Sequence, residues 1–204
     1  MGVMLRVKGK RACFSRPEFH VEAVTYDTMT PTAARAILEN IYWKPEMQWI
    51  IDGIHTLKPI QTISVMRNFI NGSGLSLPKN KPAQPISIEH TREQRYATVL
   101  VDVDYIIKAH FITKEDAAKH ISMFNRRASS GQCFRHPYLG CREFSVDSFE
   151  LVEKVPESAL KGEKPLGYML HSIDYSTGEA AYFNAVIKDG FLSVPPPDHK
   201  EVKR

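Results

Sequence analysis

A chain of 204 residues, of which 43% are hydrophobic and 25% charged, is long enough to bury one full core and is typical of an ordinary globular protein. Its 27 basic and 23 acidic residues give a net charge of +4, which is compatible with a polyanionic partner but does not require one. The three cysteines lack C-x-x-C spacing, so neither a zinc site nor a disulfide framework is predicted, and we expect reduced thiols in the cytoplasm. No stretch approaches the roughly 18 apolar residues of a membrane span, and the basic start lacks the apolar core of a signal peptide.

The first two predicted elements are a strand and a helix. Residues 3–14 alternate apolar with basic side chains, which indicates a half-buried strand. Thr30 followed by Pro31 is typical of a helix start, because threonine caps the helix and proline is tolerated at its first position. The helix is predicted to continue over residues 33–42 until Pro45 stops it.

Two strands and a long loop are predicted next. Residues 47–57 and 60–65 have strand character, with Pro59 between them. Residues 67–95 contain three prolines, two glycines and several basic side chains, which predict a long basic loop or a protruding hairpin. A basic loop of this length can grip a nucleic acid, and plain disorder is the alternative left open.

The second half of the main domain repeats the pattern of strand, helix and strand. Residues 96–112 give the strongest strand signal, because valines alternate with aspartates. Residues 113–116 resemble a capping box and predict a helix over 117–127, which Ser-Ser-Gly closes at 129–131. With a strand at 144–152, the order is β-α-β-β-α-β. This order is ferredoxin-like and the fold class is α+β. Because many functions share this fold, it indicates none by itself.

The C-terminal part predicts a separate β-rich extension. Residues 168–175 and 181–194 read as two strands of a hairpin. We therefore expect a main domain over 1–155, an extension over 156–194 and a disordered, proline-rich tail over 195–204.

Tyr42, Lys119 and His120 offer a phenol, an ammonium and an imidazole near the ends of the two main predicted helices. Such a set can cleave RNA without a metal ion, which requires that the 2′-hydroxyl be deprotonated, the phosphorane charge stabilised and the 5′-oxygen protonated. Histidine serves as base or acid, lysine stabilises the developing charge, and tyrosine orients the hydroxyl or shares in proton transfer. Lys119 and His120 are helix neighbours, so their side chains diverge by about 100° and can flank a phosphate.

Each of these residues also has a structural interpretation. A helix histidine is more often exposed and inert, a lysine is more often solvated, and a tyrosine beside a tryptophan is more often a hydrophobic anchor. Basic residues gather in 6–16 and 119–142, where charge alone leaves a solvated face and a nucleic-acid surface equally open. No metal-ligand spacing occurs in a suitable setting, so we expect no metal and no other cofactor.

Longer motifs surround the candidate residues. They are Thr30-Pro31-Thr32-Ala33-Ala34-Arg35, Tyr42-Trp43-Lys44-Pro45-Glu46-Met47, Lys58-Pro59-Ile60, Lys119-His120 with Arg126-Arg127, and Pro137-Tyr138-Leu139-Gly140-Cys141-Arg142. Together they resemble the Cas-five family of CRISPR-associated proteins, in its Dvulg or type I-C subtype, over most of the chain. One departure is Val65-Met66-Arg67-Asn68, which has one arginine fewer than is usual there.

The resemblance implies a ferredoxin-like domain of the RAMP superfamily and, in this subtype, a metal-independent endoribonuclease. Such a protein recognises the repeat hairpin of CRISPR precursor RNA, cuts at its 3′ base and leaves a 2′,3′-cyclic phosphate. It then stays on the 5′ handle of the guide RNA with the other subunits of the surveillance complex. The catalytic tyrosine, lysine and histidine of the family fall on Tyr42, Lys119 and His120. RNA contacts are expected from Lys44, Arg67, Arg126, Arg127, Arg135, Gly140 and Arg142.

Two other functions are left open. In the first, the chain only binds the handle of the guide RNA while another protein cuts the precursor. In the second, the chain is a ferredoxin-like enzyme that acts on a small molecule. The presence of all three catalytic residue types argues against the first, and the basic clusters argue against the second. Some relatives bind duplex DNA nonspecifically, and this chain carries enough positive charge to do so through phosphate contacts.

Overall fold

The computed structural model describes residues 2–203 apart from 20, 71–87, 115 and 175. The strands are β1 (Gly2–Ala12), β2 (Ala23–Val24), β3 (Met47–Thr56), β4 (Thr62–Ile70), β5 (Arg92–Thr113), β6 (Ser148–Leu151), β7 (Glu163–Ile173), β8 (Ala180–Lys188) and β9 (Phe191–Ser193). The helices are α1 (Pro31–Ile41), α2 (Ile88–Thr91) and α3 (Ala117–Ser129). The predicted α+β class is confirmed. None of the helices described is long and apolar enough to cross a membrane.

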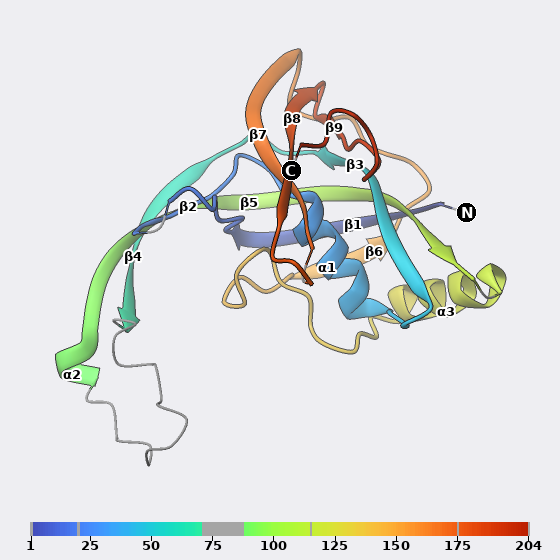
Figure 1. Ribbon diagram of the computed structural model, residues 1–204, viewed down its shortest axis with the longest axis horizontal. Coiled ribbons are helices and arrows are strands. Elements are labelled where there is room, and N and C mark those ends of the chain that lie inside the picture. The colour runs from blue at the N-terminus through green and yellow to red at the C-terminus, as the bar shows by residue number, and fades with distance from the viewer. Residues whose placement is uncertain (1, 20, 71–87, 115, 175, 204) are drawn as a thin grey trace.

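The central strand of the sheet is β5, which is 22 residues long. The hydrogen-bonded order is β6-β1-β5-β3-β9-β8-β7, while β2 and β4 also pair with β5. The pairs are antiparallel apart from β2 with β5. In Figure 1, β5 runs across the whole molecule and joins the main body to the part that protrudes on the left.

Helices α1 and α3 share one hydrophobic core with the sheet. Leu5 on β1 and Ile37 on α1 are fully buried in it. Trp49 on β3 connects the layers, because its ring centroid lies 4.8 Å from that of Phe124 on α3 and 5.2 Å from that of Phe111 on β5. Both helices are therefore held against the sheet by the same apolar cluster.

The two main helices begin with side-chain caps. The Thr30 hydroxyl accepts a hydrogen bond from the Ala33 amide, as the sequence predicts. For α3 the predicted capping box at 113–116 is wrong in one respect. The cap is Asp116, whose carboxylate accepts from the Ala118 and Lys119 amides. Thr113 cannot cap the helix, because it is still paired with Met47 in the sheet.

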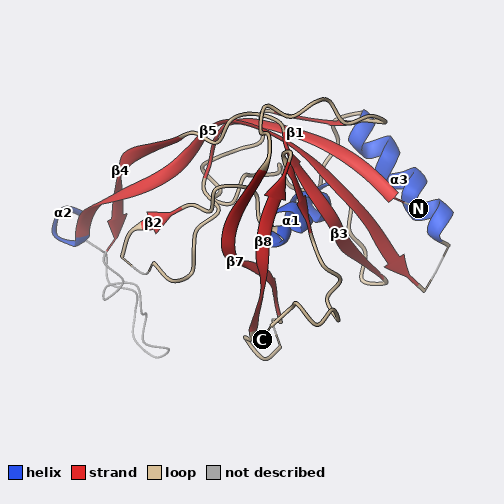
Figure 2. Cartoon of the chain, turned by 90° about the horizontal axis from the view of Figure 1, so that it is seen from above, coloured by secondary structure: helices blue, strands red, loops and turns tan. Residues whose placement is uncertain are grey.

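Strand β4 and the first half of β5 form an antiparallel hairpin, which we call the arm. It pairs Thr62 with Leu100 at its base and Ile70 with Arg92 at its far end. Of the two alternatives for residues 67–95, the protruding hairpin is therefore correct, and a loop over 67–70 and 92–95 is wrong. Residues 71–87 of the predicted loop lie outside the described residues. Figure 2 shows the arm extending away from the main body.

Strands β7 and β8 pair with each other as a hairpin, and β9 joins them to β3, so the C-terminal segment is continuous with the main sheet. The single strand predicted over 181–194 is wrong, because Asp189 and Gly190 turn the chain with positive φ between β8 and β9. The tail differs from the disorder expected over 195–204. Its Lys203 backbone exchanges two hydrogen bonds of 2.8 Å with Tyr182, and His171 contacts the Pro195 carbonyl.

The close approach of the backbone at position 140 to the backbone of Cys13 explains why a glycine occupies position 140. Gly140 has a φ of +84°, and a Cβ atom placed on it would lie 2.0 Å from the Cys13 carbonyl oxygen. The loop is closed by a hydrogen bond of 2.7 Å from the Leu139 amide to the Phe144 carbonyl. Since Phe144 and Val146 bond to Leu139 and Pro137 of this loop, the strand predicted over 144–152 is shorter, and β6 covers Ser148–Leu151.

We expect Gly140→Ala to destabilise the fold by roughly 3 kcal/mol or more, because it adds a clash to an unfavourable backbone conformation. Gly131→Ala is the matched control, since Gly131 also has a positive φ but open space around it. The control should cost about 1–2 kcal/mol. Urea denaturation of both variants measures the difference, and equal losses would contradict the close approach.

Candidate active site

Two of the three candidate catalytic residues meet at the ends of α1 and α3. Tyr42 caps the C-terminus of α1 in an extended conformation, and His120 lies on the second turn of α3. The Tyr42 hydroxyl and His120 Nδ1 are 2.9 Å apart, although the residues are 78 positions apart in the chain. A phenol and an imidazole at this distance can pass a proton between them.

The segment that carries Tyr42 is held by several contacts. The Tyr42 amide donates to the Leu38 carbonyl, which keeps the residue on the end of α1. The indole nitrogen of Trp49 donates to the Tyr42 carbonyl at 3.0 Å. Arg127 of α3 donates to the Ile41 carbonyl at 3.1 Å, and its guanidinium carbon lies 5.2 Å from the centre of the Tyr42 ring. The two helix ends are thus tied together around the tyrosine.

Both rings of the pair are buried. Tyr42 is 2% and His120 3% exposed. The second ring nitrogen of His120, Nε2, has no hydrogen-bond partner within the described residues. The Glu46 carboxylate lies 3.9 Å from it, on a side chain that is 29% exposed. A buried polar atom without a hydrogen-bond partner costs about 1–3 kcal/mol, and Glu46 offers the nearest carboxylate to Nε2 among the ion pairs of the described residues.

Lys119 lies apart from the buried pair. Its side chain is exposed, whereas that of His120 is buried, as expected for helix neighbours that diverge. The Lys119 ammonium makes no ion pair within the part of the chain that the structure describes. It is therefore available to an external anion, but the structure does not bring it against Tyr42.

Four of the predicted RNA contacts surround the end of α1. Arg126 and Arg127 occupy the last turn of α3, and Lys44 is exposed two residues after Tyr42. The Arg135 amide donates to the Asn40 carbonyl in the last turn of α1. These cations lie on the segments that frame the Tyr42–His120 pair.

The other three predicted contacts lie elsewhere. Arg67 is on the arm, where it forms an ion pair of 2.5 Å with Glu143. Arg142 is exposed in the loop that contains Gly140. Packing against Cys13 accounts for the glycine at 140, so no phosphate contact is needed to explain it.

Sequence reasoning missed Glu46 and Phe134. Glu46 belongs to the motif that starts at Tyr42, and its position directly after Pro45, in a turn next to Tyr42, is the signal that points to it. Phe134 lies outside any apolar repeat in the segment after α3, between Cys133 and Arg135, and such an unpatterned aromatic is the signal for an exposed ring. No group of three or more histidine, cysteine or acidic residues suited to a metal ion occurs in the described ranges.

Comparisons with known proteins agree with one another. The Cas5d family model, described as CRISPR-associated protein (Cas_Cas5), matches residues 2–195. The chain is 43% identical to the CRISPR pre-crRNA endoribonuclease Cas5d of Mannheimia succiniciproducens, over 99% of this chain and 98% of that protein. It is 33% identical to the protein of the same name from Thermus thermophilus, over 98% of this chain and 94% of that one.

Solved structures show a similar fold. A CRISPR-associated protein superposes with a TM-score of 0.74 at 22% identity, covering 100% of this chain and 97% of the other. A functionally uncharacterised protein from Streptococcus mutans gives 0.72 at 21% identity, with the same coverage. A chain of a CRISPR RNA-guided surveillance complex gives 0.53 at 12% identity, covering 97% and 92%.

A double-mutant cycle tests the central hydrogen bond. We expect Tyr42→Phe and His120→Leu to show a coupling free energy of unfolding of about 1 kcal/mol, because each removes one partner of a buried bond. The control cycle combines Tyr42→Phe with His110→Leu, whose side chain is 40% exposed and pairs with Asp52. Its coupling should be near zero. Equal coupling in both cycles, measured by urea denaturation, would exclude a specific Tyr42–His120 bond.

Proposed function

Since the chain belongs to the Cas5d family of CRISPR-associated proteins, we propose that it is a metal-independent endoribonuclease that cuts CRISPR precursor RNA at the 3′ base of the repeat hairpin. Two relatives that align over nearly the whole chain are named pre-crRNA endoribonucleases. The observation in the structure that carries the proposal is the hydrogen bond between Tyr42 and His120. After cleavage the protein stays on the 5′ handle of the guide RNA, beside the other subunits of the surveillance complex, in the cytoplasm where the transcript is made.

The reaction is an attack of the RNA on itself. The 2′-oxygen forms a bond to the adjacent phosphorus while the bond from phosphorus to the 5′-oxygen breaks, which leaves a 2′,3′-cyclic phosphate and a 5′-hydroxyl. The Tyr42–His120 pair removes the proton of the 2′-hydroxyl and returns a proton to the 5′-oxygen, so no proton is gained or lost overall. Lys119 stabilises the negative charge that develops on the phosphorane oxygens.

RNA must reach a pair of rings that are covered in the structure. Arg127 lies over the Tyr42 ring and is only partly buried. A guanidinium binds phosphate with two parallel hydrogen bonds, which are stronger than its single bond to the Ile41 carbonyl. We infer that an incoming phosphate draws Arg127 away and uncovers Tyr42.

Glu46 acts on the reaction through His120, as a positioning residue. If the Tyr42 hydroxyl donates to Nδ1, the proton of the neutral imidazole is on Nε2, which faces the Glu46 carboxylate. When His120 takes the phenol proton, the ring becomes cationic and the carboxylate stabilises it. The same logic of acceptor, imidazole and hydroxyl operates in serine hydrolases.

We infer that residues 1–155 form a ferredoxin-like domain and that 156–194 extend it. The support is the element order around α1 and α3 together with the neighbour order β6-β1-β5-β3, which places the fourth, first, third and second strands of such a domain side by side.

Cleavage of a labelled repeat-hairpin RNA in EDTA tests the proposed activity. We expect a cut that disappears when the scissile nucleotide carries a 2′-deoxy sugar and when His120 is replaced by alanine, while both complexes still form. Lys119→Ala should slow cutting by about a hundredfold or more, because a positioned cation is lost, and Lys114→Ala is its matched control. Binding without cutting by the unchanged protein would favour the handle-binding subunit, and no hairpin binding would reject both functions.

Glu46→Gln tests the carboxylate separately. The variant keeps the size and an acceptor oxygen but loses the charge, so we expect a fall in kcat of about tenfold or more with an unchanged Kd for the hairpin. Glu39→Gln is the control, since Glu39 pairs with Arg35 and not with His120. Nitrogen-15 NMR of the histidine rings gives an independent answer, because a proton on Nδ1 of His120 in place of Nε2 would reject the role of Glu46.

A further inference from the structure

Two large aromatic side chains are exposed beside the end of α1. Phe134 is 85% and Trp43 50% exposed. Rings of this size normally lose most of their contact with water on folding, because burying apolar surface is favourable. Two such rings at one end of a helix therefore point to a partner with apolar faces.

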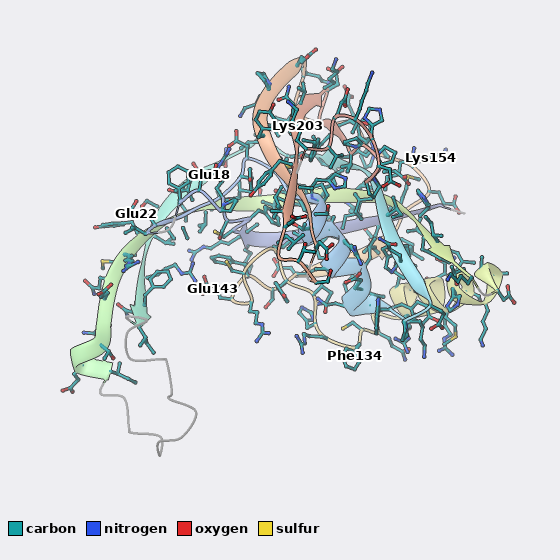
Figure 3. All side chains as sticks on the ribbon, in the orientation of Figure 1. Glu18, Glu22, Phe134, Glu143, Lys154 and Lys203 are labelled. Carbon is teal, nitrogen blue, oxygen red and sulfur yellow. The ribbon has the colours of Figure 1, made fainter. Side chains whose placement is uncertain are left out.

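The backbone explains why these rings point outward. Tyr42 is extended, with φ −153° and ψ 123°, so its side chain and that of Trp43 point to opposite sides. Tyr42 faces the core, and Trp43 faces water. Phe134 is placed by its amide, which donates to the Asn40 carbonyl at 2.8 Å in the last turn of α1. Figure 3 shows Phe134 projecting from the lower edge of the molecule, below α1.

The surroundings of the rings are basic. Lys44 follows Trp43, Arg135 follows Phe134, and Arg126 lies on the last turn of α3, all of them exposed. Aromatic rings interspersed with cations are how proteins bind single-stranded nucleic acid, because bases stack on the rings while cations contact the phosphates.

We propose that Phe134 and Trp43 form a stacking platform for the unpaired nucleotides on the two sides of the scissile phosphate. The proposal rests on the proposed function and adds a binding subsite to it. Bases inside the hairpin stem are already stacked and paired, so only the strand that leaves the stem offers free faces. Because Trp43 follows Tyr42 directly, the platform lies beside the residues that cut.

Binding of hairpin RNAs that lack single bases tests the platform. Each RNA carries a 2′-deoxy sugar at the scissile nucleotide, so that it is bound and not cut. We expect Phe134→Ala and Trp43→Ala to raise the Kd for intact RNA by at least about fivefold, the lower end of what one stacked base contributes. Phe134→Tyr should bind as the unchanged protein does. Tyr168→Ala is the control, since Tyr168 is 55% exposed, close to the 50% of Trp43, but lies on β7 of the extension.

The missing bases assign each ring to a nucleotide. Removing the base on one side of the cut should weaken binding by the unchanged protein as much as Phe134→Ala does, and should have no further effect on that variant. Removing the base on the other side of the cut should weaken binding by the unchanged protein as much as Trp43→Ala does, and should have no further effect on the Trp43→Ala variant. Unchanged Kd values for both variants, or losses that add fully to those of the missing bases, would overturn the platform and leave the endoribonuclease proposal intact. Failure of the unchanged protein to bind the hairpin would overturn both.

Discussion

The length of β5 is the constraint on which the rest of the structure depends. One end of this strand builds the arm with β4, its middle pairs with β1 and β3, and its last residue, Thr113, stands just before α3. Asp102 marks the change from arm to main body, because it has a φ of +50° and is braced by an ion pair with Lys58. The arm and the helix that carries His120 are therefore attached to opposite ends of the same strand.

The Tyr42–His120 pair shows how side chains of the candidate active site are held by ordinary packing. Tyr42 is the C-cap of α1 and His120 lies near the start of α3. The indole of Trp49 donates to the Tyr42 carbonyl and packs against Phe124 of α3. Burial removes competing water from the hydrogen bond and makes it stronger than it would be at the surface. The same burial leaves Nε2 of the histidine without a hydrogen-bond partner among the described residues, 3.9 Å from the Glu46 carboxylate. The same few side chains thus contribute both to the stability of the fold and to the geometry of the candidate site.

The sequence predicted best what is decided within a few residues. The start of α1 at Thr30 was correct because cap and helix are neighbours, whereas the cap of α3 was misplaced because sheet pairing keeps Thr113 in the strand. The pairing of Ile70 with Arg92 joins residues on either side of a long connection and has no local signal. The meeting of Tyr42 with His120 was expected only through the fold. Phe134 was missed because hydrophobic periodicity describes buried faces and not exposed rings.

Both tryptophans of the chain lie close to Tyr42 in sequence, one buried in the core and the other exposed at the surface. Trp49 is 1% exposed and hydrogen-bonded to the Tyr42 carbonyl, while Trp43 is 50% exposed. Because the chain contains only these two indoles, all of its tryptophan emission originates within seven residues of the candidate site. One fluorophore senses the apolar interior and the other senses water. The intrinsic fluorescence of the protein therefore reports on this segment without an added label. The blue-shifted emission comes from the buried Trp49, and the red-shifted emission comes from the exposed Trp43.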